Sequence, residues 1–276
     1  KSIGLVQVQE LGTLETPILL TNTLSVGTVS TALVEYMLER NDDIGLDAGT
    51  VNSLVMECND ARLSDIRGLH VTKEHARAAL AAASETFAEG DVGAGAGMVC
   101  YSLKGGIGSA SRLCHLYGET YTVGALVMTN FGTLRDLRVA GDPVGERLYR
   151  QEQSELKDKG SIIIVLATDV PLSSRQLERV AKRAQSGIAR TGGISGNGSG
   201  EIALAFTTGN KLAHYSSDRL ESIRLVYEED IDEVFRAAIE SVDEAIISSM
   251  LHASAVTGRA GNHYKSLADL YKPGEK

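Results

Sequence analysis

The chain has 276 residues, enough for one large domain or two small ones. It carries a net charge of −9 and has a pI near 5.2. Nucleic acids and anionic membrane surfaces select proteins with clustered lysine and arginine, so the composition argues against both partners. No apolar run approaches the roughly 20 residues that cross a bilayer, and the start of the chain lacks a secretion-signal pattern. We therefore expect a cytoplasmic protein.

The cysteines and histidines do not follow metal-site patterns. Cys58, Cys100 and Cys114 form no CxxC pair, and an isolated cysteine is usually a small buried hydrophobe. The six histidines include no i, i+4 pair, and no cysteine lies at ligand spacing from them. In the glycine-rich segment 93–112, Lys104 precedes the glycines instead of following them, which excludes a phosphate loop. We expect no metal, no cofactor and no disulfide framework, and a packed glycine-lined wall or close strand crossing in this segment.

Five segments have the composition of β-strands, at residues 3–8, 18–24, 122–130, 161–168 and 201–207. In the last of them, Ile202, Leu204 and Phe206 alternate with small residues, so both faces suit burial. Four segments have helical periodicity, at residues 28–40, from Thr72 onward, 177–188 after a serine cap, and 231–246. Strands separated by amphipathic helices predict a layered α/β protein with helices outside packed sheets.

A polar segment meets a buried strand at Gly160 and Ser161. Residues 138–159 are charged and poor in β-branched residues, which predicts a linker or a long surface loop. One interpretation of the glycine and serine is an ordinary turn. In the other, the Ser161 hydroxyl attacks the unhindered carbonyl of Gly160. Hydrolysis of the resulting ester would free the α-amine of Ser161, which can act as a general base for its own hydroxyl.

A second glycine-rich segment, RTGGISGNGSGEIALAFTTGN at residues 190–210, leads into another apolar strand. Its Asn-Gly and Ser-Gly pairs are typical of a flexible hairpin. Alternatively, Ser199 and Glu201 lie two residues apart at the strand start, so both polar side chains could reach one neighbouring site. The residues alone leave both interpretations open.

Six motifs in the same order resemble one family of enzymes. They are PILLTNTLSVG (17–27), KGGIGSASR (104–112), TVGALVMTNFG (122–132), GSIIIVLATDVPLSSRQLERVAKRA (160–184), the segment 190–210 and TGRAGN (257–262). Together they resemble the self-processing serine aminopeptidases, the family of DmpA-like L-aminopeptidase/D-esterases and β-peptidyl aminopeptidases. The resemblance extends over nearly the whole chain. Family members usually have a further segment before residues 5–12, which implies that part of the α subunit is missing here.

The resemblance implies a fold and a subunit organisation. The fold would be a single αββα sandwich over residues 1–276, similar to N-terminal-nucleophile hydrolases but with its own connectivity. A self-made cut between Gly160 and Ser161 would give an α subunit of residues 1–160 and a β subunit of residues 161–276. These subunits stay associated in the family, and the αβ units form tetramers. The substrates are small peptides, amides or esters with a free amine.

The resemblance also implies residue roles. Ser161 matches the nucleophile, and Ser199 and Glu201 match the hydroxyl and carboxylate that orient it. Asn130 matches the oxyanion donor, and an amide donor in place before the reaction can contribute several kcal/mol.

Two further positions concern the substrate. Glu57 matches the acid that anchors the substrate amine. Several family members have tyrosine where this chain has Asn59, so the resemblance implies a lost hydroxyl donor and a shifted substrate preference.

Two alternatives remain. One is a related acyltransferase of the ornithine acetyltransferase type, although those enzymes have threonine at the cut where this chain has Ser161. The other is an unprocessed family member that acts as a binding or assembly protein.

Overall fold

The computed structural model describes residues 2–47, 49–152, 160–216 and 220–271. A four-stranded sheet has the order β6, β7, β8, β9 (Ile107–Leu116, Glu119–Asn130, Ser161–Thr168, Gly200–Thr207). A three-stranded sheet has the order β1, β3, β2 (Ser2–Ile3, Leu54–Cys58, Ile18–Asn22). Two short pairs join β4 to β5 (Val99–Cys100, Leu103–Lys104) and β10 to β11 (Val256–Thr257, His263–Tyr264).

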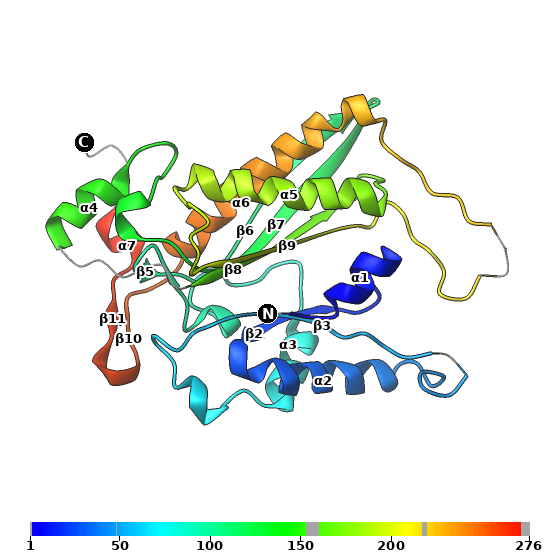
Figure 1. Cartoon of the computed structure of the whole chain (residues 1–276), viewed down its shortest axis with the longest axis horizontal. Helices are drawn as coiled ribbons and strands as arrows, with labels where there is room; N and C mark the ends of the chain where they lie inside the picture. The colour runs from blue at the N-terminus through cyan, green and yellow to red at the C-terminus, as the bar shows by residue number, and fades with distance from the viewer. Residues whose placement is uncertain (1, 48, 153–159, 217–219, 272–276) are drawn as a thin grey trace.

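The described helices are α1 (Leu5–Leu11), α2 (Val26–Leu38), α3 (Lys73–Ala82), α4 (Val144–Glu152), α5 (Ser174–Arg190), α6 (Asp232–Leu251) and α7 (Leu267–Leu270). Four of the seven described helices, α2, α3, α5 and α6, lie outside the two main sheets (Figure 1). In Figure 1, α5 and α6 cover one face of the four-stranded sheet, while α2 and α3 lie beyond the three-stranded sheet. The expected αββα layers are thus confirmed.

Strand β8 is apolar without interruption because both of its faces are buried. Ile162, Ile164 and Leu166 belong to the large core shared with α5 and α6. Ile163 and Val165 point the other way, into the core between the two sheets. A central strand with helices on one side and a second sheet on the other buries both faces, so alternation with polar residues disappears.

The three-stranded sheet also has two buried faces, one toward the other sheet and one toward α2. Leu54 and Met56 of β3 face the other sheet, whereas Val55 packs with Val29 and Leu33 of α2. Because successive side chains on a strand alternate between faces, the next residue on the α2 side is Glu57. This alternation places the Glu57 carboxylate on the face of β3 that points toward α2, away from the other sheet.

Most of the expected elements are confirmed. The strand expected at 161–168 has those bounds, and those expected at 18–24, 122–130 and 201–207 correspond to β2, β7 and β9. The expected helices correspond to α2, α3, α5 and α6. The predicted serine cap of α5 is Ser173, whose hydroxyl accepts from Gln176 N at 3.2 Å while the Gln176 side chain accepts from Ser173 N at 3.2 Å.

Two expectations were wrong. Residues 3–8 do not form one strand, because the backbone turns at Gly4 (φ 90) and continues as α1. Leu5 and Val8, three residues apart, pack against the core between the sheets, which is a helical spacing. The segment 138–159 is not a simple loop, since it contains α4, in which Val144 and Leu148 are buried. Its last part, residues 153–159, lies outside the described residues.

The glycine-rich segment 93–112 packs as a wall in which strands approach closely. Gly90 and Ile107 exchange backbone hydrogen bonds of 2.7 and 2.8 Å. The Lys104 ammonium is fully buried and donates to the carbonyls of Gly95, Met98 and Gly105 at 2.9, 3.1 and 2.6 Å. Burial lowers the pKa of Lys104 to about 8, partly opposed by the charge of Asp91. Lys104 thus ties three carbonyls of this segment together.

Among the described helices, none combines the length and apolar character that crossing a membrane requires. Within the same described ranges, no three His, Cys, Asp or Glu side chains gather closely enough to hold a metal ion.

Candidate active site

Five strand ends meet at one end of the sandwich. Strand β7 ends at Asn130, which pairs with Ser161 at the start of β8, and Ser161 in turn pairs with Gly200 at the start of β9. In the other sheet, the parallel strands β2 and β3 end at the paired residues Asn22 and Cys58. The sheets are in contact here, because Cys58 Sγ lies 3.5 Å from the carbonyl oxygen of Ser161. This end therefore collects loops and polar side chains from both sheets.

Ser161 faces the space between the sheets. It shares the face of β8 with Ile163 and is only 1% exposed. Its Oγ has no hydrogen-bond partner among the described residues. A buried hydroxyl without a partner is uncommon in a folded protein, because desolvation leaves an uncompensated cost. The hydroxyl is therefore free to react or to meet a ligand.

Asn130 is fixed beside Ser161. Directly paired residues on antiparallel strands have Cβ atoms about 4.5–5.5 Å apart on the same face, and Asn130 is the antiparallel partner of Ser161. The Asn130 Oδ1 accepts from Val99 N at 3.0 Å, and its Nδ2 donates to the Asn59 carbonyl at 2.9 Å. An amide nitrogen carries two hydrogens, so one donor remains for a further acceptor.

Asn59 helps to orient Asn130 through its backbone carbonyl and not through its side chain. Its carbonyl holds the Asn130 amide, while its own Oδ1 accepts from Ala61 N at 3.0 Å and so closes a turn. Asn59 itself is exposed. The structure thus places Asn59 next to Asn130, with its side chain engaged in local structure.

Gly160 lies where only glycine fits. A Cβ built on Gly160 would lie 1.6 Å from the carbonyl oxygen of Asn130, far inside any contact distance. The Gly160 carbonyl accepts a hydrogen bond from Gly200 N at 3.2 Å. The peptide group between Gly160 and Ser161 is therefore held between β7 and β9, with its carbonyl oriented by a fixed donor.

Glu201 lies on the other face of the four-stranded sheet, and Ser199 lies in the loop directly before β9. Glu201 pairs with Ile162, whose side chain points toward α5, so Glu201 faces α5 and not the space between the sheets. Its Oε2 accepts from Ser195 Oγ at 2.9 Å. Glu201 Oε1 and Ser199 Oγ are buried and have no hydrogen-bond partner in the described part of the chain. The structure brings Ser161 together with Asn130, but it does not place Glu201 on their face.

Glu201 also lines a cavity of about 350 Å³ between β9 and α5. Polar lining comes from Glu178, Lys182 and Gln185 of α5, and the apolar lining includes Ile164 and Ile188. The Gln185 side chain donates to Ser195 Oγ, which in turn donates to Glu201. A chain of hydrogen bonds thus connects α5 to this carboxylate.

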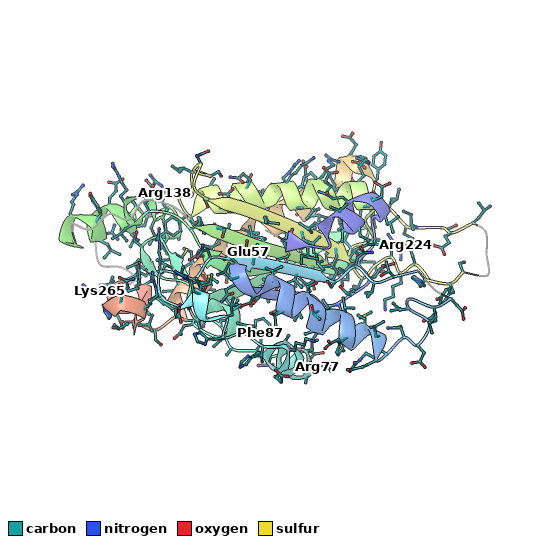
Figure 2. The ribbon with its side chains drawn as sticks, turned by 60° about the horizontal axis from the view of Figure 1, so that its bottom comes forward. Glu57, Arg77, Phe87, Arg138, Arg224 and Lys265 are labelled. Atoms are coloured by element: carbon teal, nitrogen blue, oxygen red, sulfur yellow. The ribbon has the colours of Figure 1, made fainter. Side chains whose placement is uncertain are left out.

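Glu57 lies on the α2 side of β3 and is 1% exposed. Figure 2 shows it in the interior of the molecule, whereas Arg77, Arg138, Arg224 and Lys265 lie near the margins. Thr23 donates a hydrogen bond to Glu57 Oε2, and Oε1 has no partner among the described residues. Glu57 immediately precedes Cys58, which touches Ser161, so its carboxylate lies at the same end of the sandwich.

Sequence reasoning missed several residues at this end. Tyr101 is fully buried, contacts the ring of Phe131 edge-on at 5.1 Å between centroids, and shares a 2.8 Å hydrogen bond with Thr191. It thereby links the end of β7 to the loop that leads to Ser199. Asp60 is also buried and was missed, although its position three residues after Glu57 and after the end of β3 was a usable signal.

Comparisons with known proteins match almost the entire chain. A β-peptidyl aminopeptidase, BapA of Sphingosinicella microcystinivorans, is 40% identical over 273 residues, covering 94% of this chain and 68% of that protein. BapA of Sphingosinicella xenopeptidilytica is 35% identical over 269 residues, covering 92% of this chain and 67% of that protein.

Three solved structures have the same fold. A protein of Pyrococcus horikoshii OT3 has a TM-score of 0.92 and 52% identity, covering 97% of this chain and 74% of that one. A β-aminopeptidase of a Burkholderia species has a TM-score of 0.87 and 38% identity, covering 99% and 79%. The L-aminopeptidase D-Ala-esterase/amidase of Ochrobactrum anthropi, described as a new variant of the Ntn hydrolase fold, has a TM-score of 0.89 and 35% identity, covering 97% and 74%.

The chain also matches a protein-family model. The model of peptidase family S58 matches residues 1–264, which include β6 to β9 and each candidate site residue. The expected resemblance and the hydrolase class are thereby confirmed, and the chain belongs to peptidase family S58.

Proposed function

We propose that this protein is a self-processing aminopeptidase whose nucleophile is Ser161. The observation that carries the proposal is the Ser161 hydroxyl, which is buried, has no partner in the described structure and lies at a strand start beside Asn130. The family match and the aminopeptidases among the relatives support the hydrolase activity. The residue roles below are part of the proposal.

Self-processing would begin with the peptide bond that Gly160 shares with Ser161. Ser161 Oγ attacks the Gly160 carbonyl carbon, the C–N bond breaks, and the acyl group moves to oxygen while the nitrogen gains a proton. Water then hydrolyses the ester, leaving a carboxylate on Gly160 and a free α-amine on Ser161. The crowded contact with Asn130 O supports this step, because it permits no side chain beside the carbonyl.

The cut would divide the domain into residues 1–160 and 161–276 without separating the parts. Strand β7 of the first part pairs with β8 of the second over eight residue pairs, from Val123 with Thr168 to Asn130 with Ser161. Ladder hydrogen bonds and the shared core would hold the fragments together after the cut. The tetramer of αβ units and the cytoplasmic location remain expectations from the family resemblance and the sequence.

Peptide hydrolysis would use the new amine as the base. A backbone amine lies in the plane of the sheet, so it can be approached from both faces. Ser161 Oγ would then act between the sheets, while Glu201 approaches the amine from the α5 side. Ser199, in the loop directly before β9, would assist it, and one side-chain oxygen of each residue has no partner among the described residues. The free N–H of Asn130 would donate to the oxyanion as the acyl-enzyme forms and breaks.

Glu57 would bind the ammonium group of the substrate, which makes the enzyme an exopeptidase. A buried carboxylate with one free oxygen can accept a charge-assisted hydrogen bond from an ammonium. Acetylation of the substrate removes this charge, so we expect hydrolysis of alanine p-nitroanilide or β-alanine p-nitroanilide to fall at least about 100-fold when the amine is acetylated.

The assay compares kcat/KM for each anilide with that of its N-acetyl derivative. Equal hydrolysis of free and acetylated forms would contradict the exopeptidase proposal. Adding an amino-acid acceptor and analysing the products tests the acyltransferase alternative, for which transfer to the acceptor would exceed hydrolysis.

A further inference from the structure

Three buried oxygens without partners belong to residues that hydrogen bonds tie to residues 22–25, at the same end of the sandwich as the proposed nucleophile. They are Glu57 Oε1, Asp60 Oδ1 and Ser25 Oγ, none of which has a hydrogen-bond partner in the described structure. The three residues are 1%, 7% and 1% exposed. Since buried polar atoms are normally paired, three such atoms on residues of one hydrogen-bonded group indicate a place prepared for a ligand.

One turn holds all three residues. The 3₁₀ turn η1 (Thr23–Ser25) follows the end of β2, and Thr23 donates to the second oxygen of Glu57. Asn22 donates through Nδ2 to Asp60 Oδ2 at 3.3 Å and accepts at Oδ1 from Ser25 N at 3.1 Å. One oxygen of each carboxylate is thus fixed, by Asn22 at the end of β2 or by Thr23 of the turn, and the other oxygen of each is left over.

The region adjoins Ser161. Strands β2 and β3 are parallel and end at the same edge, so the turn after β2 lies beside residues 58–60 after β3. Cys58 touches the Ser161 carbonyl, and Asn59 holds the Asn130 amide through its own carbonyl. Asp60 is the next residue along the chain. The leftover oxygens therefore lie at the same end of the sandwich as the residues proposed to attack the substrate, and those of the two carboxylates belong to residues next to Cys58 or Asn59 in the chain.

The missing partner should be a cation. Neither Glu57 nor Asp60 forms an ion pair with a lysine, arginine or histidine within the described ranges. Burying a carboxylate is costly unless a positive charge or several hydrogen bonds compensate it. A primary ammonium carries one positive charge and three N–H donors, which matches three free acceptors of which two are carboxylate oxygens.

We propose that Asp60 and Ser25 complete, with Glu57, a three-acceptor site for the primary ammonium of the substrate. This inference rests on the proposed aminopeptidase function and adds two residues that would discriminate an unsubstituted amine from a substituted one. An N-methylated amine has one donor fewer and is bulkier. Its methyl group would be directed at the neutral Ser25 hydroxyl, because both remaining N–H groups bind the carboxylates more strongly.

The test uses the better substrate of the alanine and β-alanine p-nitroanilides, together with its N-methyl derivative. For the primary amine, Asp60→Asn should raise KM about 10- to 100-fold with kcat largely unchanged. The hydrogen bond between the substrate ammonium and the Asp60 carboxylate is weakened equally in the substrate complex and in the transition state. Ser25→Ala should raise KM about 3- to 10-fold, and it breaks no hydrogen bond with the residues that the structure describes.

The selectivity ratio separates binding from a structural effect. Ser25→Ala should lower the preference for the primary over the N-methyl amine about 10-fold, because it removes the third acceptor and makes room for the methyl group. A general loss of structure would lower both rates and leave the ratio unchanged. The matched control is Asp65→Asn, an exposed acid of the same loop paired with His70, which should keep the wild-type KM and ratio.

The outcomes distinguish the two proposals. If the wild-type protein hydrolyses neither anilide, the aminopeptidase function fails, and this site fails with it. If the wild type is active but Asp60→Asn and Ser25→Ala keep its KM and its selectivity ratio, only the three-acceptor site is overturned.

Discussion

Replacing Ser161 with alanine should leave an uncut chain of 29.3 kDa without aminopeptidase activity. The substitution removes only Oγ, which forms no hydrogen bond with the described residues, so β8 and its packing should be preserved. Loss of a nucleophile typically lowers kcat by a factor of about 10⁴ or more. Intact-mass measurement after storage and an assay with the p-nitroanilides check both expectations.

The matched control is Ser186→Ala, which removes a hydroxyl from an exposed position of α5. This variant should be cut and active like the wild type. If the Ser161→Ala protein were still converted into two fragments, Ser161 could not be the group that attacks Gly160. If it stayed intact but retained full activity, the nucleophile would have to be another residue.

Replacing Gly160 with alanine should block self-processing while Ser161 is still present. The added Cβ would overlap the Asn130 carbonyl oxygen, with only 1.6 Å between the two atoms, so the backbone at residue 160 must move. This movement displaces the carbonyl from Gly200 N and from the Ser161 hydroxyl. A misplacement of about 1 Å can slow a reaction about 100-fold, and overpacking of this kind lowers the free energy of unfolding by about 1–3 kcal/mol.

The rate of fragment formation on gels and the midpoint of thermal unfolding measure the two effects. Gly49→Ala is the control, because a Cβ at Gly49 meets no atom within 4 Å. It should change neither measurement. Normal cleavage and unchanged stability of the Gly160→Ala protein would show that the close contact with Asn130 does not constrain the peptide bond.

Parts of the fold could be predicted because local and tertiary preferences agree. The run after Ser161 is β-branched and apolar, which suits a strand whose two faces are both buried. The predicted strand 161–168 therefore begins and ends where β8 does. Helix α5 combines a capping box at Ser173 with an apolar stripe, so its start was also visible. In such segments, propensity, pattern and burial lead to the same answer.

Other parts depend on contacts that sequence patterns do not contain. Residues 5–11 alternate like a strand, but tertiary packing of Leu5 and Val8 favours a helix. The position of Glu201 on the α5 face follows from its parallel register with β8, which spacing along one strand cannot reveal. The same is true of Asp60 and Ser25, which are 35 residues apart in number and are connected through Asn22 only because β2 and β3 end at one edge.

The N-terminal sequence of the smaller fragment of the mature protein tests the central claim most directly. Our account predicts a single sequence, Ser-Ile-Ile-Ile-Val, which begins at Ser161 and continues along β8. A fragment that begins at any other residue, or a mature and active protein that remains one chain, would contradict it.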